Sequence, residues 1–271
     1  GETVIGWMLV WRDITEERKL NDLRQELSSM IVHDLRSPLT AIISSLTLLN
    51  DLLEEDALDR ETLAEVIGIA RLSSDSMLRL VESLLDIARL EQNRVALDLS
   101  ICHLQDVVDS AYTAVMSLAL EAEIAIEVNL PDDLPPVWID MAQIHRVLVN
   151  LLDNALRHTP YGGKVLIEAE RLQDADAVCV SVSDSGPGIP VEARAAVFEK
   201  FSQLDKSAVR GHKGSGLGLT FCKLVVEAHG GQIWVEDAPL GGAAFRFTLP
   251  LAHGRSSHVQ STATNGATHS H

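Results

Sequence analysis

Two segments of the chain combine side chains and spacings that suit the binding of a flat ligand with a metal ion. Asn150, Asn154 and His158 follow one another at intervals of four residues, which places them on one face of a helix. An Asn side chain offers a hard carbonyl oxygen that Mg²⁺ accepts. Further along, residues 184–189 (Asp-Ser-Gly-Pro-Gly-Ile) join a carboxylate, an acceptor for amino groups, to glycines that let a flat ligand approach the main chain. Taken singly, these segments are equally compatible with a solvated helix face and an ordinary turn.

A glycine-rich segment at residues 214–219, Gly-Ser-Gly-Leu-Gly-Leu, precedes a helical apolar pattern. The free main-chain N–H groups at the start of a helix bind phosphates and other anions. No Gly-Lys-Ser or Gly-Lys-Thr ends the segment, so it is not a Walker A loop. It predicts a phosphate site of another kind or, on its own, a plain turn.

Apolar residues at helical spacing predict a helical hairpin over residues 15–94. They recur every three or four positions over residues 20–49 and again over 63–87, and the acidic segment 50–59 separates the two patterns. A single hairpin cannot enclose its own apolar stripes. We therefore expect two copies to pair as a four-helix bundle in a homodimer.

The region 95–251 has the mixed pattern of an α/β domain. Alternating apolar residues predict strands and wider apolar spacing predicts helices. The expected strands are 96–101, 124–128, 165–170, 178–183, 232–235 and 244–249, and the expected helices are 104–120, 140–158 and 217–229, with a turn-rich break at 131–136. The whole chain is therefore assigned to the α+β class, with a helical-hairpin dimerisation domain followed by an α/β sandwich.

The composition excludes several classes of function. Asp and Glu number 39 against 22 Lys and Arg, and the formal net charge of −17 argues against a nucleic-acid partner. No apolar run reaches the roughly 20 residues that span a bilayer, so no membrane span is expected in this fragment. The 3 cysteines are far apart and form no Cys-x-x-Cys pair, which predicts neither a disulfide framework nor a zinc site.

The two ends of the chain are expected to lie outside these domains. Residues 4–14 are rich in β-branched and aromatic residues, as in a strand, and residues 252–271 lack apolar periodicity, as in a disordered tail. The start carries neither an initiator Met nor a signal sequence. We therefore expect a fragment of a longer protein, with this fragment in the cytoplasm.

Taken together, the motifs resemble those of a known family. The Asn helix, the Asp-x-Gly-x-Gly segment, Phe-Glu-Lys-Phe at 198–201 and the Gly-x-Gly-x-Gly segment occur in the order of the Bergerat ATP-binding fold of the GHKL superfamily. Residues 33–40, His-Asp-Leu-Arg-Ser-Pro-Leu-Thr, resemble the H box of the sensor histidine kinases of two-component systems. Residues 6–15 resemble the last strand of a PAS sensor domain with its Asp-Ile-Thr exit.

The resemblance implies an ATP-dependent protein-histidine kinase in which His33 takes the γ-phosphoryl group and passes it to an aspartate of a response-regulator receiver domain. A neutral imidazole is a competent nucleophile near physiological pH, and Asp34, as orienter or general base, can accept its N–H and fix its tautomer. Because Pro38 cannot donate to the Asp34 carbonyl, we expect the helix to weaken or bend there. Ser37 stands where relatives carry Thr or Asn, and it is a candidate for orienting water in the reverse, phosphatase reaction.

The resemblance also assigns a nucleotide site, with ATP and Mg²⁺ as the implied ligands. Asp184 would bind the adenine amino group, Asn154 the Mg²⁺, and Asn150 would support them. The further implied nucleotide contacts are Arg157, His158, Gly186, Gly188, Ile189, Lys206, Arg210, Lys213, Gly214, Ser215, Gly216, Leu217, Gly218 and Leu219. The basic residues at 206–213 lie where the family has a mobile ATP lid. Many relatives carry an Arg at Gln203, so Arg210 or Lys213 is a candidate replacement.

Two other functions share parts of these motifs. The ATP hydrolases of the GHKL superfamily carry a Glu base four residues before the metal-binding Asn, and Asn150 stands there instead; an amide cannot activate water as a carboxylate does. A non-catalytic dimeric nucleotide-binding scaffold would not need His33 and Asp34. The sequence therefore favours the kinase, with a homodimer through 15–94, a response-regulator receiver domain and an upstream PAS-like sensor as partners.

Overall fold

The computed structural model describes residues 15–54, 59–91, 97–173, 175–200, 202 and 216–252, and of residues 15–30, 33, 34 and 91 it describes the main chain. The expected PAS-like strand at 1–14, the segment 203–215 and the tail beyond 252 lie outside these residues. By its internal contacts the chain divides into two compact units, residues 1–82 and 83–271.

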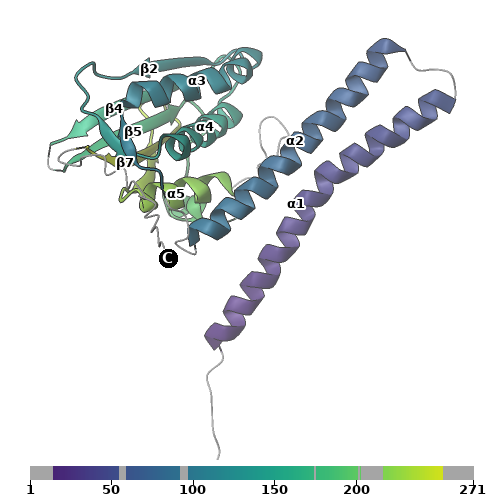
Figure 1. Ribbon diagram of the computed structural model, residues 1–271, viewed down its shortest axis with the longest axis horizontal. Coiled ribbons are helices and arrows are strands. Elements are labelled where there is room, and N and C mark those ends of the chain that lie inside the picture. Colours follow the sequence, from purple (N-terminus) through teal and green to yellow (C-terminus); the bar gives the residue numbers. More distant parts are fainter. Residues whose placement is uncertain are drawn as a thin grey trace, which may run out of the picture. The chain divides into compact units, whose positions relative to one another are not determined.

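Two long helices, α1 (Thr15–Glu54) and α2 (Arg60–Glu91), confirm the predicted hairpin (Figure 1). Asp59 caps α2, because its Oδ1 accepts the N–H of Thr62 at 2.7 Å. The predicted break at 50–59 was too long: α1 continues to Glu54, and a 3.0 Å hydrogen bond from the Asn50 side chain to Glu54 supports the added turn. Pro38 lies inside α1, which continues through it.

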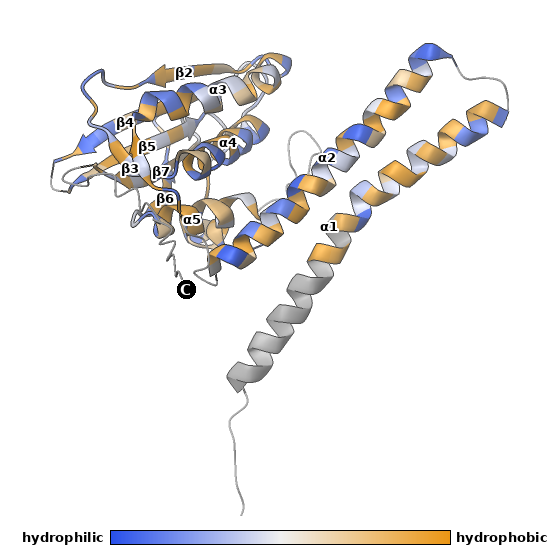
Figure 2. Cartoon of the chain, in the orientation of Figure 1, coloured by the Kyte–Doolittle hydropathy of each residue, from blue (hydrophilic) through white to orange (hydrophobic). Residues whose placement is uncertain are grey.

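The hairpin helices leave many large apolar side chains in contact with water. Figure 2 shows hydrophobic residues spread along α2 and along the coloured part of α1. Among the described side chains of this unit, Val66 and Leu80 are buried, whereas a larger apolar set is exposed: Val32, Leu39, Ile43, Leu46, Leu48, Leu53, Ile67, Ile69, Leu72, Leu78 and Val81. The apolar stripes of one chain therefore exceed what its own hairpin covers.

The second unit is built on a five-stranded sheet with the strand order β2-β4-β5-β7-β6. Its strands are β2 (Ala125–Asn129), β4 (Lys164–Leu172), β5 (Ala177–Asp184), β6 (Ile233–Asp237) and β7 (Ala243–Pro250). The β2 and β4 strands pair in parallel and the other neighbours are antiparallel. All five strands overlap the expected segments, and the α+β class is confirmed.

Three helices, α3 (Leu104–Glu121), α4 (Met141–His158) and α5 (Gly218–Ala228), cover one face of this sheet (Figure 1). Their apolar sides form the core with the inward residues of the strands, and Val147, Leu148, Phe221 and Phe247 are almost fully buried. Short 3-10 turns at Val191–Ala193 and Ala196–Phe198 follow β5. The last turns of α2 also belong to this unit, where Asp86 forms an ion pair with Arg146 at 2.6 Å.

A two-stranded sheet lies beside the main one and was only half expected. Its strand β1 (Ser100–Cys102) falls at the end of the expected strand 96–101, but β3 (Val137–Ile139) was not predicted. The strand has 3 residues and follows directly after Pro135-Pro136, so its pattern is too short to detect. Its Val137 and Ile139 are fully buried, so packing and pairing with β1 make it a strand.

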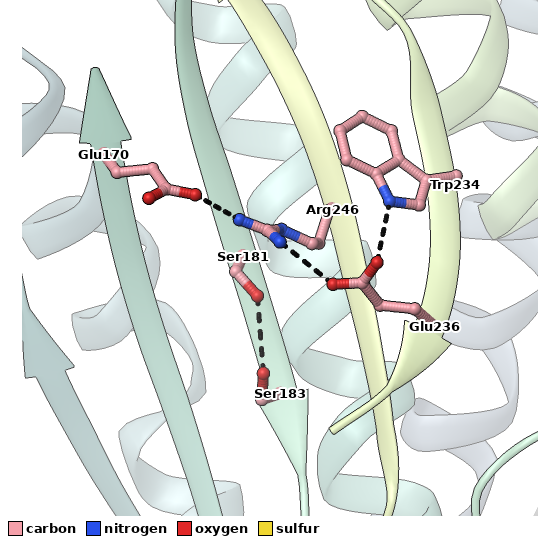
Figure 3. A network of polar contacts seen from close by, with 6 residues as sticks. All are labelled: Glu170, Ser181, Ser183, Trp234, Glu236 and Arg246. Carbon is pink, nitrogen blue, oxygen red and sulfur yellow. Dashed lines mark hydrogen bonds and ion pairs between the residues drawn. The ribbon is translucent and has the colours of Figure 1, made fainter. Parts of the chain in front are cut away.

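The other face of the main sheet carries a polar network centred on Arg246 of β7 (Figure 3). The guanidinium pairs with Glu170 of β4 and with Glu236 of β6, and lies over the ring of Trp234 at 5.9 Å from its centroid. Trp234 in turn donates to Glu236 at 3.3 Å. Four neighbouring strands are spanned by this network, because β5 and β7 lie between Glu170 and Glu236.

Candidate active site

Asp184 is the last residue of β5 and its carboxylate lies on the helix-covered side of the sheet. Alternation along the strand gives it the same direction as the buried Val180 and Val182. The residue is 3% exposed, and burial raises the pKa of its carboxyl, against the opposing effect of two main-chain hydrogen bonds and of nearby His158. A buried carboxylate with a raised pKa at the end of a central strand is a candidate ligand-binding group.

One oxygen of this carboxylate is already engaged by the protein. Oδ1 accepts the N–H of Gly186 at 2.8 Å and the N–H of Ala243 at 3.2 Å. In the described part of the chain, no donor reaches Oδ2. The arrangement leaves one acceptor of fixed orientation for an amino group of a ligand.

The helix α4 brings the Asn face to the same place. Asp140 begins it as an N-cap, its side chain accepting the N–H of Gln143 at 3.1 Å, and the apolar face that follows is buried. Asn154 and His158, both half-buried, lie one turn apart toward its C-terminal end. The carbonyl of His158 approaches Gly186 so closely that a Cβ there would lie 2.8 Å from it. The predicted neighbourhood of the Asn helix and the Asp-x-Gly turn is therefore present.

Three residues of α4 have different surroundings. The Asn150 side chain lies against the first turn of α5, where a Cβ at Gly218 would be 3.6 Å from its oxygen. Arg157 forms an ion pair with Asp153 one turn earlier, at 2.5 Å. Asn154 has no hydrogen-bond partner among the described residues, which leaves its amide oxygen available for a metal ion.

The N-terminus of α5 provides main-chain donors. Its N-cap residue is Leu217, whose apolar side chain cannot accept a hydrogen bond, so Leu217 does not cap the N–H groups of the first turn by its side chain. Gly216, directly before it, has a φ of +66°, a conformation that favours glycine. No acidic residue lies in the first turn of α5. Main-chain N–H groups at the start of a helix are a chemically suitable place for a phosphate group.

The two ends of the segment 199–219 are joined by a hydrogen bond. The hydroxyl of Thr220 donates to the carbonyl of Phe198 at 3.1 Å. Phe198 is buried and its ring meets that of Phe245 edge-on, with 6.2 Å between centroids. Phe198 is therefore part of the core, and Phe201 lies outside the described residues.

The remaining predicted site residues fall into two groups. Gly188 has a φ of +73°, the Ile189 carbonyl accepts from Arg194 at 3.1 Å, and Leu219 is half-buried in the first turn of α5. Ser37 is exposed on α1, whose main chain also includes His33 and Asp34. Outside the described residues lie Lys206, Arg210, Lys213, Gly214 and Ser215. No group of three or more His, Cys, Asp or Glu residues in the described ranges could by itself hold a metal ion.

The sequence interpretation missed the loop between β6 and β7. Gly242 and Ala243 touch the Asp184 turn directly, the first by close packing and the second by a hydrogen bond. The only signal in the sequence is the Gly241-Gly242 pair between two strand patterns, which indicates a turn but not what the turn contacts.

Comparison with known proteins identifies the family. Residues 139–253 match the model of the histidine kinase-, DNA gyrase B- and HSP90-like ATPases, and residues 23–93 match the His Kinase A phospho-acceptor domain. The chain belongs to the sensor histidine kinases of two-component systems. The alginate biosynthesis sensor protein KinB of Pseudomonas aeruginosa is 34% identical over 247 residues, which are 91% of this chain and 40% of KinB.

Solved structures of other histidine kinases have the same architecture. Full-length ShkA in complex with AMPPNP is 29% identical with a TM-score of 0.61, covering 84% of this chain and 46% of ShkA. The histidine kinase ThkA in complex with the response regulator TrrA is 25% identical with a TM-score of 0.64, covering 88% of this chain and 65% of ThkA. This histidine kinase chain thus spans about half the length of such relatives. In its described residues, the helices are all too short or too polar to cross a membrane.

Proposed function

We propose that this chain is the catalytic core of a protein-histidine kinase, which uses ATP to phosphorylate His33 and passes the phosphoryl group to an aspartate of a response-regulator receiver domain. The observation that carries the proposal is the single place where the buried Asp184 carboxylate, the Asn face of α4 and the uncapped start of α5 come together. Family membership in both halves of the chain supports it.

ATP would lie across this place with its base at Asp184. The open Oδ2 would accept from the adenine amino group, and the phosphates would reach the first turn of α5 (216–219). Arg157, His158 and the basic residues Lys206, Arg210 and Lys213 would neutralise phosphate charge, and the glycines 186, 188 and 214 with Ser215 and Ile189 would line the nucleotide. Phosphoryl transfer needs positioning and charge neutralisation above all.

Mg²⁺ fits the residues present. Its protein ligand would be Asn154, whose half-buried amide oxygen has no partner among the described residues, and phosphates and water complete such a shell. When bound, the ion would neutralise the developing charge on the phosphates. Asn150, packed against Gly218, would fix the position of α4 relative to α5 rather than touch the ion.

The chemical step forms one bond to the γ-phosphorus and breaks one. One imidazole nitrogen of His33 attacks the γ-phosphorus, an N–P bond forms, and the bond to the bridging oxygen of ADP breaks. Asp34 accepts the other ring N–H and stabilises the positive charge that develops. In the second step the carboxylate of the receiver takes the phosphoryl group and His33 regains its neutral form.

The partners follow from the same reading. The exposed apolar residues of the hairpin support a homodimer through residues 15–94, in which they would pack in a four-helix bundle. A catalytic domain at 95–251, a PAS-like sensor ending at residue 14 and a cytoplasmic location for this fragment complete the proposal. Ser37, exposed on the H-box helix, would orient water in dephosphorylation.

The test is label transfer from γ-labelled ATP. The purified chain with Mg²⁺ should acquire label that is labile to acid and stable to alkali, and His33→Ala should abolish it while nucleotide still binds. His103→Ala, which changes an exposed histidine of the catalytic unit, is the control and should label normally. Label that survives in His33→Ala would refute the assignment of His33.

A further inference from the structure

The turn after β5 is held by a glycine that lies 58 positions further along the chain in the β6–β7 loop, Gly242. A Cβ at this position would lie 2.2 Å from Oδ1 of Asp184, 2.4 Å from the Asp184 carbonyl oxygen and 2.6 Å from the nitrogen of Gly186. Real Cβ atoms essentially never approach other atoms this closely. The two segments therefore touch through their main chains.

Neither segment can withdraw from the other without breaking regular structure. The carbonyl of Gly242 accepts the N–H of Ala238 at 2.8 Å, and Ala243 is already paired with Asp237 as β7 begins. Asp184 is still within β5, paired with Val165 of β4. Rotation of the Asp184 side chain would relieve only the contact with Oδ1, so a Cβ at 242 would also displace the main chain at Asp184 and Gly186.

The contact has a consequence for the direction of the carboxylate. Gly242 allows the next residue, Ala243, to bring its N–H to Oδ1 at 3.2 Å, beside the donor at Gly186. With two donors on Oδ1, rotation of the carboxylate is opposed and Oδ2 keeps one direction. An added methyl group at 242 would occupy the space of Oδ1 and break this arrangement.

We propose that Gly242 is a positioning residue for base recognition, which sets the direction in which Asp184 accepts the amino group of adenine. The inference rests on the proposed function, because it takes the ligand of Asp184 to be an adenine nucleotide. Gly242 acts through Asp184 and touches no substrate atom itself.

The experiment compares the affinity of the chain for ATP with that for purine riboside triphosphate, which lacks the exocyclic amino group. The wild type should prefer ATP by about 10- to 100-fold, the range of a hydrogen bond to a charged acceptor. Gly242→Ala should lose most of this preference, by weaker binding of ATP and nearly unchanged binding of the analogue. In the Asp184→Ala background, Gly242→Ala should have little further effect on ATP affinity.

Gly231→Ala is the matched control. Its Cβ would lie 2.0 Å from the carbonyl oxygen of Thr248, so it overpacks the opposite end of β7 in the same way. It should keep the preference for ATP. If Gly242→Ala does not fold, Ala243→Pro removes the donor to Oδ1 at the first residue of a strand, where proline is tolerated, and should lose the preference likewise.

Three outcomes would overturn the inference. A folded Gly242→Ala that keeps the wild-type preference, or one that weakens both nucleotides equally, contradicts a positioning role. A wild type that binds both nucleotides equally removes the assigned contact of Asp184 and the inference with it. Label transfer to His33 is measured separately, so failure of the kinase proposal is distinguishable from failure of this one.

Discussion

The main-chain N–H of Asp140 donates to Nε2 of His229 at 3.0 Å, which joins the start of α4 to the end of α5. The other ring nitrogen, Nδ1, lies 2.7 Å from the carbonyl of Val225 and carries the proton. His229 is 7% exposed. The neutral ring is the form that can accept from Asp140, so protonation of His229 would break the link between the two helices that frame the nucleotide site.

We predict that the catalytic unit loses stability as pH falls below about 6.5, the ordinary pKa of histidine. Burial lowers the pKa of His229, outweighing the raising effect of its bond to Val225 and of Asp140. Between the pKa of His229 in the folded chain and its higher pKa in the unfolded chain, the unfolded chain binds a proton and the folded chain does not. The free energy of unfolding therefore decreases as pH decreases through this range. Urea unfolding from pH 5.5 to 8 measures this dependence.

The matched variant for this prediction is His229→Gln, whose amide oxygen can accept from Asp140 without titrating. Its unfolding free energy should fall less over the same pH range, because the other titrating groups are common to both chains. Equal slopes for the two proteins would contradict the role of His229.

A second prediction concerns the carboxylate of Asp184, which is expected to serve binding at the expense of stability. Burial raises the pKa of this group, so the ionised form is unfavourable in the fold and stability declines as pH rises from about 3.8 through the folded value. Asp184→Asn keeps an oxygen for the donors at Gly186 and Ala243 but turns an NH₂ group toward the base.

We expect Asp184→Asn to be as stable at pH 7 as the wild type or more so, by up to about 1 kcal/mol. Its affinity for ATP should fall by at least about tenfold, since a donor would then face the adenine amino group. Thermal unfolding and nucleotide titration of the same preparation measure both effects. Loss of more than about 1 kcal/mol of stability would show that the charge is needed by the fold.

The main helices and strands of the catalytic unit could be predicted because their apolar residues recur at regular spacing over many positions, which shows which side of each element is buried. The alternation along β5 has 8 residues and ends at Asp184, so both the strand and the candidate acceptor were found from the sequence. The four-residue spacing of Asn150, Asn154 and His158 likewise requires only that one helix form. Local periodicity is sufficient for features of this kind.

Features that depend on contacts between distant segments could not be predicted. The approach of Gly242 to Asp184 joins positions 58 apart in the sequence, and the pairing of β3 with β1 joins two segments of 3 residues each. Neither leaves a periodic signal, because what determines it is the packing of main chain against main chain. The contact of Asn150 with Gly218 belongs here too, because the spacing along α4 says nothing of what the side chain meets on α5.

A third prediction separates the two asparagines of α4. Asn154→Ala should weaken the binding of ATP in the presence of Mg²⁺ by about 10- to 100-fold and leave binding in the presence of EDTA nearly unchanged, because it removes a metal ligand and no other described contact. Titration of nucleotide with and without Mg²⁺ measures the difference.

Asn150→Ala is the companion variant and should behave differently. Removing a side chain that lies between α4 and the first turn of α5 should lower stability by about 1–2 kcal/mol and weaken nucleotide binding whether or not Mg²⁺ is present. If Asn154→Ala showed this metal-independent pattern instead, its assignment to Mg²⁺ would be wrong.

A fourth prediction concerns the polar network on the outer face of the sheet, which is expected to stabilise the fold without serving the site. Arg246 alternates with the inward Phe245 and Phe247, so it points away from the face on which Asp184 lies. In Arg246→Met the carboxylates of Glu170 and Glu236 lose their shared partner. Both carboxylates are more than a third exposed, so water screens them and the loss should be about 1–2 kcal/mol.

Arg171→Met provides the control, since it changes another arginine of the same sheet that is exposed on β4 and should shift stability by less than about 0.5 kcal/mol. Urea unfolding of both variants, with ATP titration, separates the two effects. Arg246→Met should keep wild-type affinity for ATP because the sheet lies between its side chain and the nucleotide. A fall in affinity without a fall in stability would instead make the outer face part of the nucleotide site.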